Sequence, residues 1–261
     1  MHPILFKIGP ITIYTYGLFI FLGVLAGYIV CRNQAKASNI SLNIFSDIFF
    51  WSLLSGFLGA RIFYILIEWR IFLRNPLGII FSRSGFVFYG GLIAGIIMMI
   101  FLSHRNKISF LKIGDIFAIG TPLAHSLGRL GCFFYGCCYG RPSNSFVSIL
   151  FPPDSPAGFS GLRVIPTQLI SAFFLLLIFF LLLVIKKYKK FDGYILFVYI
   201  FIYGIFRFII EFFRGDPRGH FFSFSTSQAV SIFAVVLSMT LFYWYRQRSC
   251  NFKKNKYNRS S

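Results

Sequence analysis

Seven long apolar runs, separated by polar connections, dominate the pattern of hydrophobic and polar positions along the chain. A helix needs about 20 mostly apolar residues to cross the hydrocarbon core of a bilayer. The runs lie at roughly 13–31, 46–68, 85–103, 112–131, 166–185, 193–213 and 226–245. They predict an all-α, polytopic integral membrane protein in which a single domain, residues 1–245, contains seven transmembrane helices.

The composition agrees with a membrane protein. Apolar residues make up 57% of the chain and charged residues 13%, whereas a soluble domain carries about 45–50% and about 25%. So few charges cannot cover a water-facing surface, which excludes an ordinary soluble enzyme and a disordered chain. The net charge of +19 would suit nucleic-acid binding only if the basic residues shared a soluble face. They lie between apolar runs instead, so we expect a lipid bilayer and no nucleic acid as the partner.

The distribution of lysine and arginine predicts how the spans are oriented, because cytoplasmic connections carry more of these residues. Fifteen lie in one set of connections, counted together with the C-terminal tail, and eight lie in the other set. We therefore expect the N-terminus outside, on the periplasmic side, and the C-terminus in the cytoplasm. The tail, 246–261, is expected to be a disordered basic segment attracted to anionic lipid. The longest connection, 132–165, is expected to form an extracytoplasmic loop or head.

Two further patterns predict packing and not chemistry. Three aspartates fall at the inner ends of spans, where a carboxylate can cap a helix N-terminus; they are Asp47, Asp115 and Asp192. Small residues recur at about four-residue spacing in the second run and predict a close-packing helix face; they are Ser52, Ser55, Gly56 and Gly59.

The remaining polar residues of the spans gather in the outer halves, and polar groups inside a membrane are costly and usually functional. They are Tyr14, Tyr16, Arg61, Tyr89 with Gly90 and Gly91, His125, Arg129, Gln168, Tyr203, Arg207, Glu211 with Arg214 just beyond it, and Gln228. The three arginines inside spans face a single carboxylate, so we expect guanidinium groups that lack internal counter-ions. Phosphate accepts paired hydrogen bonds from such a group, which predicts a phosphate-bearing ligand with a phospholipid headgroup as its nearest source. For the Arg207–Glu211 pair alone, a purely structural role is as well supported.

Glycine is dense in the stretch from His125 to Arg141 that contains Arg129. These glycines are Gly128, Gly131, Gly136 and Gly140. Because glycine lets a backbone approach a ligand closely, we expect the N–H groups of this stretch to form an anion-binding nest with Arg129.

The same stretch resembles the signature of the prolipoprotein diacylglyceryl transferases, which reads Gly-Arg-x-Gly-Asn-Phe-x-Asn-Gly-Glu-x-x-Gly-Arg. The matching residues are Gly128, Arg129, Gly131, Phe133, Gly136, Gly140 and Arg141. Other parts agree in order and position: Tyr16-Gly17, Gly59-Ala60-Arg61, Tyr89-Gly90-Gly91-Leu92, Pro166-Thr167-Gln168-Leu169, and Tyr203-Gly204 through Arg207 to Glu211-Phe212-Phe213-Arg214. The resemblance covers nearly the whole chain.

The resemblance implies a multi-pass transferase of the bacterial inner (plasma) membrane that needs no metal and no soluble cofactor. Its substrates would be phosphatidylglycerol and a prolipoprotein whose signal peptide ends before a lipobox cysteine. The diacylglyceryl group would move to the thiol of that cysteine as a thioether, and glycerol 1-phosphate would leave.

The resemblance also implies site residues, and we expect catalytic roles for Arg129, Arg207, Glu211, Tyr16 and Tyr203. Arg129 would bind phosphatidylglycerol and, with Arg207, stabilise the charge on the departing phosphate. Glu211 would hold Arg207 or take a proton, and the tyrosines would orient the glycerol or relay a proton. The substrate-binding set is completed by Tyr89, Gly90, Gly91, Gly140, Arg61 and Arg214.

One departure from the family concerns the base that accepts the thiol proton. Tyr89 stands where most members have a histidine before the two glycines, so a mechanism that uses this histidine does not transfer. A thiol ordinarily has a pKa of about 8.5, which nearby arginines lower, so a modest base suffices. His125, one turn before Arg129, is a candidate substitute, although a lone histidine in a span more often makes a packing hydrogen bond.

The other departure is a group of cysteines. Cys132, Tyr135 and Cys137 replace two asparagines and a glutamate of the signature, and Cys138 follows. Zinc sites usually contain paired Cys-x-x-Cys elements, which this spacing lacks, so we expect structural thiols and no metal. A disulfide between Cys132 and one of the other two stays open, because the outer side is oxidising.

A transporter of an anionic or phospholipid-headgroup substrate is the alternative function, because it would also need arginines in a cavity. Transporters usually place their sites at the bilayer midplane and contain internal repeats. In this chain the polar residues crowd one side and no repeat is found, which favours the enzyme. A lipid-binding scaffold without activity is a third interpretation, and substitution of Arg129 separates it from the enzyme.

Overall fold

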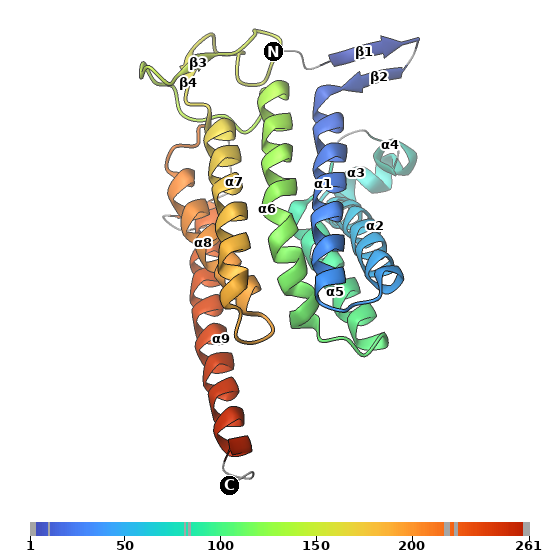
Figure 1. The fold of residues 1–261 in the computed structure, drawn as a ribbon. Helices are drawn as coiled ribbons and strands as arrows, with labels where there is room; N and C mark the ends of the chain where they lie inside the picture. Colours follow the sequence, from blue (N-terminus) through green and yellow to red (C-terminus); the bar gives the residue numbers. More distant parts are fainter. Residues whose placement is uncertain are drawn as a thin grey trace. The chain divides into compact units, whose positions relative to one another are not determined.

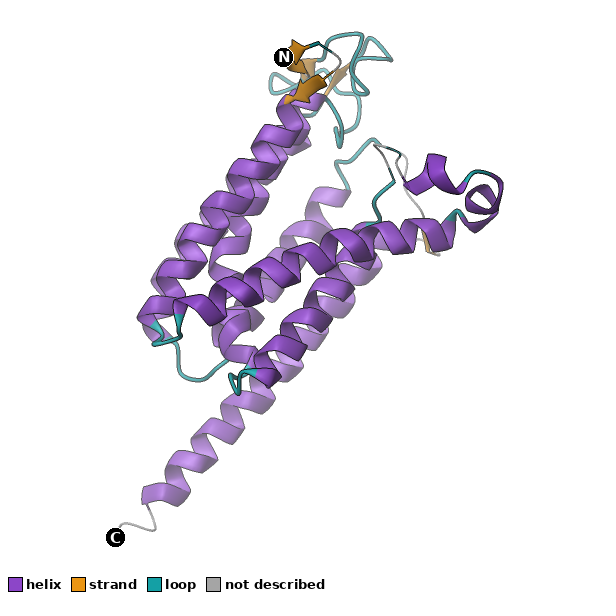
Figure 2. Ribbon diagram, turned by 90° about the vertical axis from the view of Figure 1, so that its right-hand side faces the viewer, coloured by secondary structure: helices purple, strands orange, loops and turns teal. Residues whose placement is uncertain are grey.

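A computed structural model describes most of the chain, and helices make up most of what it describes (Figure 2). The described residues are 4–9, 11–80, 82, 85–216, 220–221 and 224–257. The chain divides into two compact units, one of Met1–Cys31 with Gly114–Ser261 and the other of Arg32–Ile113. Each unit is described by itself below.

Six helices of the described residues are long and apolar enough to cross a membrane. They are α1 (Thr15–Ala37), α2 (Leu42–Ile67), α5 (Phe88–Arg105), α7 (Thr167–Ile185) with the short 3-10 helix η1 (Lys186–Tyr188), α8 (Tyr194–Glu211) and α9 (Thr226–Tyr257). Each overlaps one of the predicted runs, so the chain is a multi-pass membrane protein. The seventh predicted run, 112–131, lies in α6 (Phe110–Tyr135), a helix whose apolar run is interrupted by Lys112, Asp115, His125 and Arg129.

The segment after residue 245 differs from the prediction. It was expected to be disordered, but α9 continues as a helix to Tyr257, and only 258–261 lie outside the described residues. Lysine and arginine are good helix formers. Their charge also interacts favourably with the negative end of a helix dipole, so a basic sequence extends this C-terminus instead of fraying it.

Short strands and two short helices occupy the connections, so the all-α prediction needs a correction. Antiparallel pairs join β1 (Ile4–Ile8) to β2 (Ile11–Tyr14), β3 (Ile149–Leu150) to β4 (Arg163–Val164), and β5 (His220–Phe221) to β6 (Phe224–Ser225). The short helices are α3 (Trp69–Arg74) and α4 (Pro76–Ile80). These elements pair main-chain groups between the long helices and are too short to leave a clear period in the sequence.

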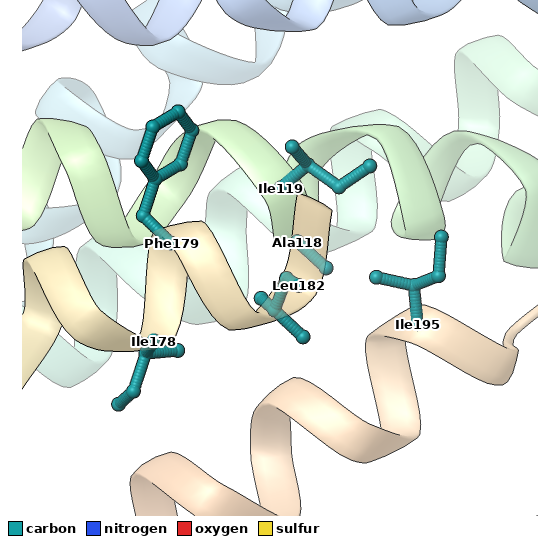
Figure 3. Close-up of a cluster of buried hydrophobic side chains, with 6 residues drawn as sticks. All are labelled: Ala118, Ile119, Ile178, Phe179, Leu182 and Ile195. Atoms are coloured by element: carbon teal, nitrogen blue, oxygen red, sulfur yellow. The ribbon is translucent and has the colours of Figure 1, made fainter. Parts of the chain in front are cut away.

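The larger unit is built around contacts of α6, α7 and α8. Figure 3 shows the buried cluster: Ala118 and Ile119 of α6, Ile178, Phe179 and Leu182 of α7, and Ile195 of α8. Helix α9 packs along α8. In Figure 1 the segment with β3 and β4 lies at one end of α6 and α7, and α9 extends past their other end.

A buried carboxylate fixes the start of α8. Asp115, 2% exposed, accepts hydrogen bonds from the N–H groups of Gly193 (2.8 Å) and Leu196 (2.9 Å). Lys189 lies 3.0 Å from the same carboxylate and 2.9 Å from Asp192. Burial opposes the charge of Lys189, yet its bonds to Asp192 and Asp115 raise its pKa. The prediction that Asp115 caps the start of its own span is therefore wrong, because the helix it caps is the neighbouring α8.

In the smaller unit, α2 and α5 pack closely through small residues. A Cβ at Gly59 would lie 2.3 Å from the Cβ of Ala94 and 2.8 Å from the carbonyl oxygen of Gly90. A Cβ at Gly91 would lie 2.8 Å from the carbonyl oxygen of Gly56. The predicted close-packing face of the second run is confirmed by these contacts.

We expect Asp115→Ala to lower the free energy of unfolding by about 2–4 kcal/mol, because it removes a helix cap and the buried partner of Lys189. Denaturant unfolding in detergent micelles, followed by circular dichroism, measures the change. Asp192→Asn is the control, since the Asp192 side chain is 45% exposed and its ion pair should contribute less than about 1 kcal/mol. Equal losses in the two variants would contradict the capping role.

Gly59→Ala should destabilise the smaller unit by about 1–3 kcal/mol through overpacking against Ala94 and Gly90. The matched change Gly56→Ala places its Cβ 3.4 Å from the carbonyl oxygen of Gly91, an ordinary contact. There the gain in helix propensity, up to about 1 kcal/mol, should offset or exceed the cost. The same unfolding measurement separates the two, and a Gly59→Ala protein as stable as Gly56→Ala would refute the packing argument.

Candidate functional site

Three segments distant in sequence cross at Gly140, beyond the end of α6. The Gly140 N–H donates to the carbonyl of Ile165 (2.9 Å), and the Arg141 N–H donates to the carbonyl of Phe213 (2.9 Å). A Cβ at residue 140 would lie 2.6 Å from the first carbonyl oxygen and 2.8 Å from the second. Glycine is thus required here by the close approach of two backbones, and the crossing ties the end of α6 to the segments before α7 and after α8.

Four amides of the glycine-rich stretch, where a backbone nest was expected, already have carbonyl partners. Besides Gly140 and Arg141, the N–H groups of Gly136 and Cys137 are also bonded, both to the carbonyl of Cys132 at 2.9 and 3.1 Å. Amides that already have carbonyl partners cannot turn to an anion without breaking these bonds. At these four positions the backbone serves turns and close packing, so an anion beside them would be bound by side chains.

The connection that follows is folded around its own small core. Phe151, Ala157 and Val164 are buried, and Phe133, Tyr139 and Ile149 pack against them. The Arg163 guanidinium donates to the carbonyl of Ser148 at 2.7 Å.

Within the described part of the chain, Arg129 of the larger unit is held by a histidine and not by a carboxylate. Its Nε donates to Nε2 of His125, one turn earlier on α6, at 3.1 Å. The His125 ring stands edge-on to the ring of Tyr203, with centroids 5.6 Å apart, which links α6 to α8. Among the described residues, no carboxylate forms an ion pair with Arg129, so the prediction of an arginine without an internal acidic partner is confirmed at this position.

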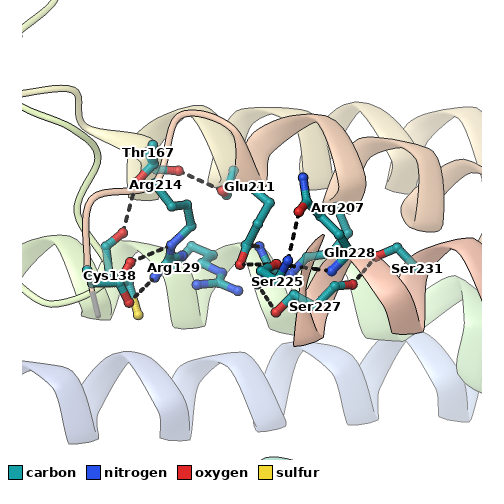
Figure 4. A network of polar contacts seen from close by, with 12 residues as sticks. Arg129, Cys138, Thr167, Arg207, Glu211, Arg214, Ser225, Ser227, Gln228 and Ser231 are labelled. Carbon is teal, nitrogen blue, oxygen red and sulfur yellow. Dashed lines mark hydrogen bonds and ion pairs between the residues drawn. The ribbon is translucent and has the colours of Figure 1, made fainter. Parts of the chain in front are cut away.

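Arg207 and Glu211, in contrast, form a closed network between α8 and α9 (Figure 4). Nη1 of Arg207 lies 2.8 Å from Oε2 of Glu211, and its Nη2 donates to the hydroxyl of Ser227 at 2.9 Å. The other oxygen of Glu211 accepts from the hydroxyl of Ser225 at 2.9 Å. Because Glu211 is 7% exposed, this is a desolvated ion pair whose partners hold each other in place.

Ser225, the last residue of β6, also caps the start of α9, a role that the sequence analysis missed. Its N–H donates to Oε1 of Gln228 (2.9 Å), and its hydroxyl accepts from the N–H of Gln228 (3.2 Å). This reciprocal pair is a capping box, and the Ser-x-x-Gln spacing before an apolar run is the signal that could have revealed it. The start of α9 and the end of α8 are thus joined through Glu211.

Arg214 is also matched. Its Nε and Nη2 donate to the two oxygens of Asp216, at 2.7 and 2.9 Å, and its guanidinium interacts with the Cys138 side chain. Burial disfavours the charge of Arg214, but the hydrogen bonds to Asp216 and the contact with Cys138 raise its pKa above the ordinary value. Asp216 was not singled out in the sequence, although an Arg-Gly-Asp turn directly after an apolar run is a local pairing signal.

Three cysteines lie beside these arginines. Cys132, Cys137 and Cys138 are free thiols, so the structure holds none of the disulfides left open by the sequence. Tyr16, on the first turn of α1, lies at the same end of α6 as these thiols. Its ring centroid lies 6.2 Å from that of Tyr135, and the backbone of α6 approaches it at Gly131. The larger unit thus brings Tyr16, Arg129 and the thiols together.

The remaining predicted site residues belong to the smaller unit. Arg61 donates to the carbonyls of Gly85 (2.9 Å), Ile79, Ile80 (2.9 Å) and Ser82 (3.0 Å), and its guanidinium lies 5.2 Å from the ring centre of Phe86. The prediction for Arg61 concerned counter-ions, and the acceptors that hold its guanidinium are neutral: backbone carbonyls of a connection take the place of an anion.

The other predicted residues of this unit lie at the start of α5. Gly90 and Gly91 pack against Phe63, Gly56 and Ala60 of α2, and Tyr89 is 37% exposed with its ring edge-on to Phe88.

Comparison with known proteins gives a consistent result. The family model described as "Prolipoprotein diacylglyceryl transferase" matches residues 3–244. A protein of Clostridium tetani named phosphatidylglycerol–prolipoprotein diacylglyceryl transferase is 35% identical over 93% of this chain and 97% of its own length. A protein of the same name from Finegoldia magna is 36% identical over 95% and 97%, and one from Staphylococcus carnosus is 31% identical over 94% and 91%. The chain therefore belongs to the prolipoprotein diacylglyceryl transferase family.

Proposed function

We propose that this protein transfers the diacylglyceryl group of phosphatidylglycerol to the thiol of the lipobox cysteine of prolipoproteins. The relatives carry both substrates in their names. In the proposed reaction the thiolate attacks the carbon of the diacylglyceryl group that is bonded to the phosphate oxygen. A thioether bond forms, this carbon–oxygen bond breaks, and glycerol 1-phosphate departs.

The single observation that carries the proposal is the state of Arg129. Its guanidinium is half-buried, donates to one imidazole and forms no ion pair with a carboxylate of the described residues. An arginine fork in this state matches the paired oxygens of a phosphate. In the reaction, the same fork would stabilise the charge that develops as the phosphate leaves.

Arg207 and Glu211 act in this proposal as positioning residues. Both charges are already used within the α8–α9 network, so neither has to bind the phosphate directly. What they supply is a fixed C-terminal half of α8; Tyr203 lies one turn before Arg207, and its ring meets that of His125, which holds Arg129. Tyr16, near Arg129 and the thiols, is the tyrosine best placed to orient the glycerol.

His125 is a poor base in this arrangement. Its Nε2 accepts a hydrogen bond from Arg129, and a protonated imidazole has no acceptor at that nitrogen. Taking a proton there would break the bond and put two cations side by side. We therefore assign His125 to orienting Arg129.

Of the other residues expected to bind substrate, Gly140 supports the site through backbone packing, and Gly90 and Gly91 pack within the smaller unit against α2. Arg61 holds its own connection, Arg214 holds Asp216 beside Cys138, and Tyr89 is kept as a candidate headgroup contact.

The proposed topology has seven spans, with α6 as the seventh, the N-terminus outside and the C-terminus in the cytoplasm. This orientation rests on the unequal distribution of lysine and arginine. The set of connections that includes the C-terminal tail carries more of these residues, and cytoplasmic connections are the ones enriched in them. Arg129 would then lie near the outer surface of the bacterial inner membrane, where secreted prolipoproteins and phosphatidylglycerol are both within reach.

Arg129→Ala should lower kcat/KM for thioether formation about 10²–10³-fold, because one preorganised donor group for the departing phosphate is lost. Mass spectrometry of a lipobox peptide incubated with the purified protein and phosphatidylglycerol measures the gain of one diacylglyceryl unit. Arg129→Lys should recover only part of the activity, since an ammonium lacks the fork. Arg32→Ala, which removes an exposed arginine near the other end of α1, is the control and should stay within about threefold of wild type. Full activity in Arg129→Ala would sink the assignment.

The positioning role of the α8–α9 ion pair predicts a rescue. Glu211→Gln alone should destabilise the protein by about 3–5 kcal/mol, because it leaves the Arg207 charge without its partner. The double variant Arg207→Met/Glu211→Met should recover most of that stability and, with it, thioether formation to within about tenfold of wild type. Unfolding in micelles and the peptide assay measure the two quantities. Restored stability with no activity would instead make one of these side chains a direct participant.

A further inference from the structure

The three cysteines at the end of α6 form a compact sulfur cluster. Cys132, Cys137 and Cys138 each place one sulfur within 4.8 Å of the other two, and all three are free thiols. Each residue is half-buried, so the cluster is sheltered but open to a ligand from outside. The reaction proposed above does not use these thiols.

Backbone contacts hold the cluster rigidly. Cys132 lies on the last turns of α6, and Cys137 and Cys138 follow in the turn beyond it. Cys138 has a φ of 63°, a left-handed conformation that a side-chain-bearing residue rarely adopts. Its carbonyl accepts from the Thr167 hydroxyl, and that of Cys137 accepts from the Gln168 amide, both at 2.8 Å. This unusual turn brings two consecutive thiols to the same place as the third.

Three convergent thiols are a donor set for a soft or borderline metal ion. Tetrahedral zinc binds thiolates at about 2.3 Å, which puts their sulfurs about 3.8 Å apart. Sulfurs within 4.8 Å of one another therefore need to contract only slightly. Zinc sites that do chemistry have three protein ligands and one open position. Among the described residues, the cluster contains no fourth cysteine, histidine or carboxylate.

We propose that Cys132, Cys137 and Cys138 bind a Zn²⁺ ion whose open fourth position takes the thiol of the lipobox cysteine. The inference rests on the proposed function, since it names how that reaction obtains its nucleophile. It also departs from the sequence analysis, which favoured a purely structural role for these cysteines.

The charges around the cluster suit this site. Three thiolates and one Zn²⁺ carry a formal charge of −1. Arg214 interacts with Cys138 and is itself matched by Asp216, and Arg129 interacts with Cys132. Because Arg214 is already matched by Asp216, Arg129 is the cation that lies beside both the metal centre and the proposed phosphate site.

The step balances without a redox partner. A thiol that binds zinc loses its proton, here to solvent water. The resulting thiolate attacks the glycerol carbon of phosphatidylglycerol, the carbon–sulfur bond forms, and the carbon–oxygen bond to the phosphate breaks. The electron pair leaves with glycerol 1-phosphate, beside Arg129. A metal-bound thiolate removes the need for a histidine base, which this chain lacks at Tyr89 and cannot readily obtain from His125.

Cobalt substitution tests the site directly. The full-length protein in detergent micelles is stripped with a chelator and loaded with Co²⁺, and its absorption spectrum is recorded. We expect sulfur-to-cobalt charge-transfer bands and the d–d bands of a tetrahedral centre. Both should be lost in Cys137→Ala and kept in Cys31→Ala, which removes a buried thiol of α1 bonded to the carbonyl of Ile116. A wild-type protein without thiolate bands would overturn the proposal, whatever the folding of the variants.

The fourth position is tested by adding substrate to the cobalt-loaded wild type. A lipobox peptide should shift the d–d bands, and the same peptide with serine in place of cysteine should not. An unchanged spectrum with the cysteine peptide would refute thiol capture.

Thioether formation is followed in parallel by mass spectrometry. Zinc-loaded protein should be at least tenfold faster than chelator-stripped protein. Equal rates would overturn the metal proposal and leave the transferase function intact, whereas no product from any form would count against the function itself.

Discussion

The architecture of the site depends on how guanidinium groups are satisfied in an apolar surrounding. Each buried arginine needs a carboxylate, a set of carbonyls or a ligand, because a lone cation there is too costly. Arg207 is matched by Glu211, Arg214 by Asp216, and Arg61 by the carbonyls of its own connection. Arg129 is held by one imidazole, and this difference is why we propose Arg129, and not the other three arginines, as the anion-binding group.

Backbone hydrogen bonds between distant segments fix the position of the groups around Arg129. The contacts at Gly140 fix the chain beyond α6 against the segments before α7 and after α8, so the thiols and Arg214 stay beside Arg129. At the next helix pair, the Ser225–Gln228 cap and Glu211 fix where α9 starts. Helices fray at their ends, because the terminal N–H and C=O groups lack partners within the helix. A site built on helix ends therefore needs hydrogen bonds and caps of this kind to be rigid.

The long helices follow from sequence because bilayer thickness imposes a length on apolar runs. The runs at 166–185 and 193–213 differ from α7 and α8 by two residues or fewer at each end. In contrast, no local sequence pattern predicts which side chain will contact a residue that is distant in the sequence. Asp115 caps a helix about eighty positions away, and Arg61 finds carbonyls beyond its own helix. The residue types of the site could thus be predicted, whereas which arginine remained available required the three-dimensional arrangement.

If the reaction takes place beside Arg129, as proposed, the three free thiols nearby carry a hazard for the protein itself. A thioether bond does not reverse under mild conditions, so any cysteine of the enzyme that reached the glycerol carbon would retain the lipid and end turnover. The strained turn at Cys138 and the clamped carbonyls of Cys137 and Cys138 oppose this self-inactivation, because they keep the sulfurs directed at one another. In this view the rigid turn keeps the cysteines of the enzyme from being alkylated by its lipid substrate.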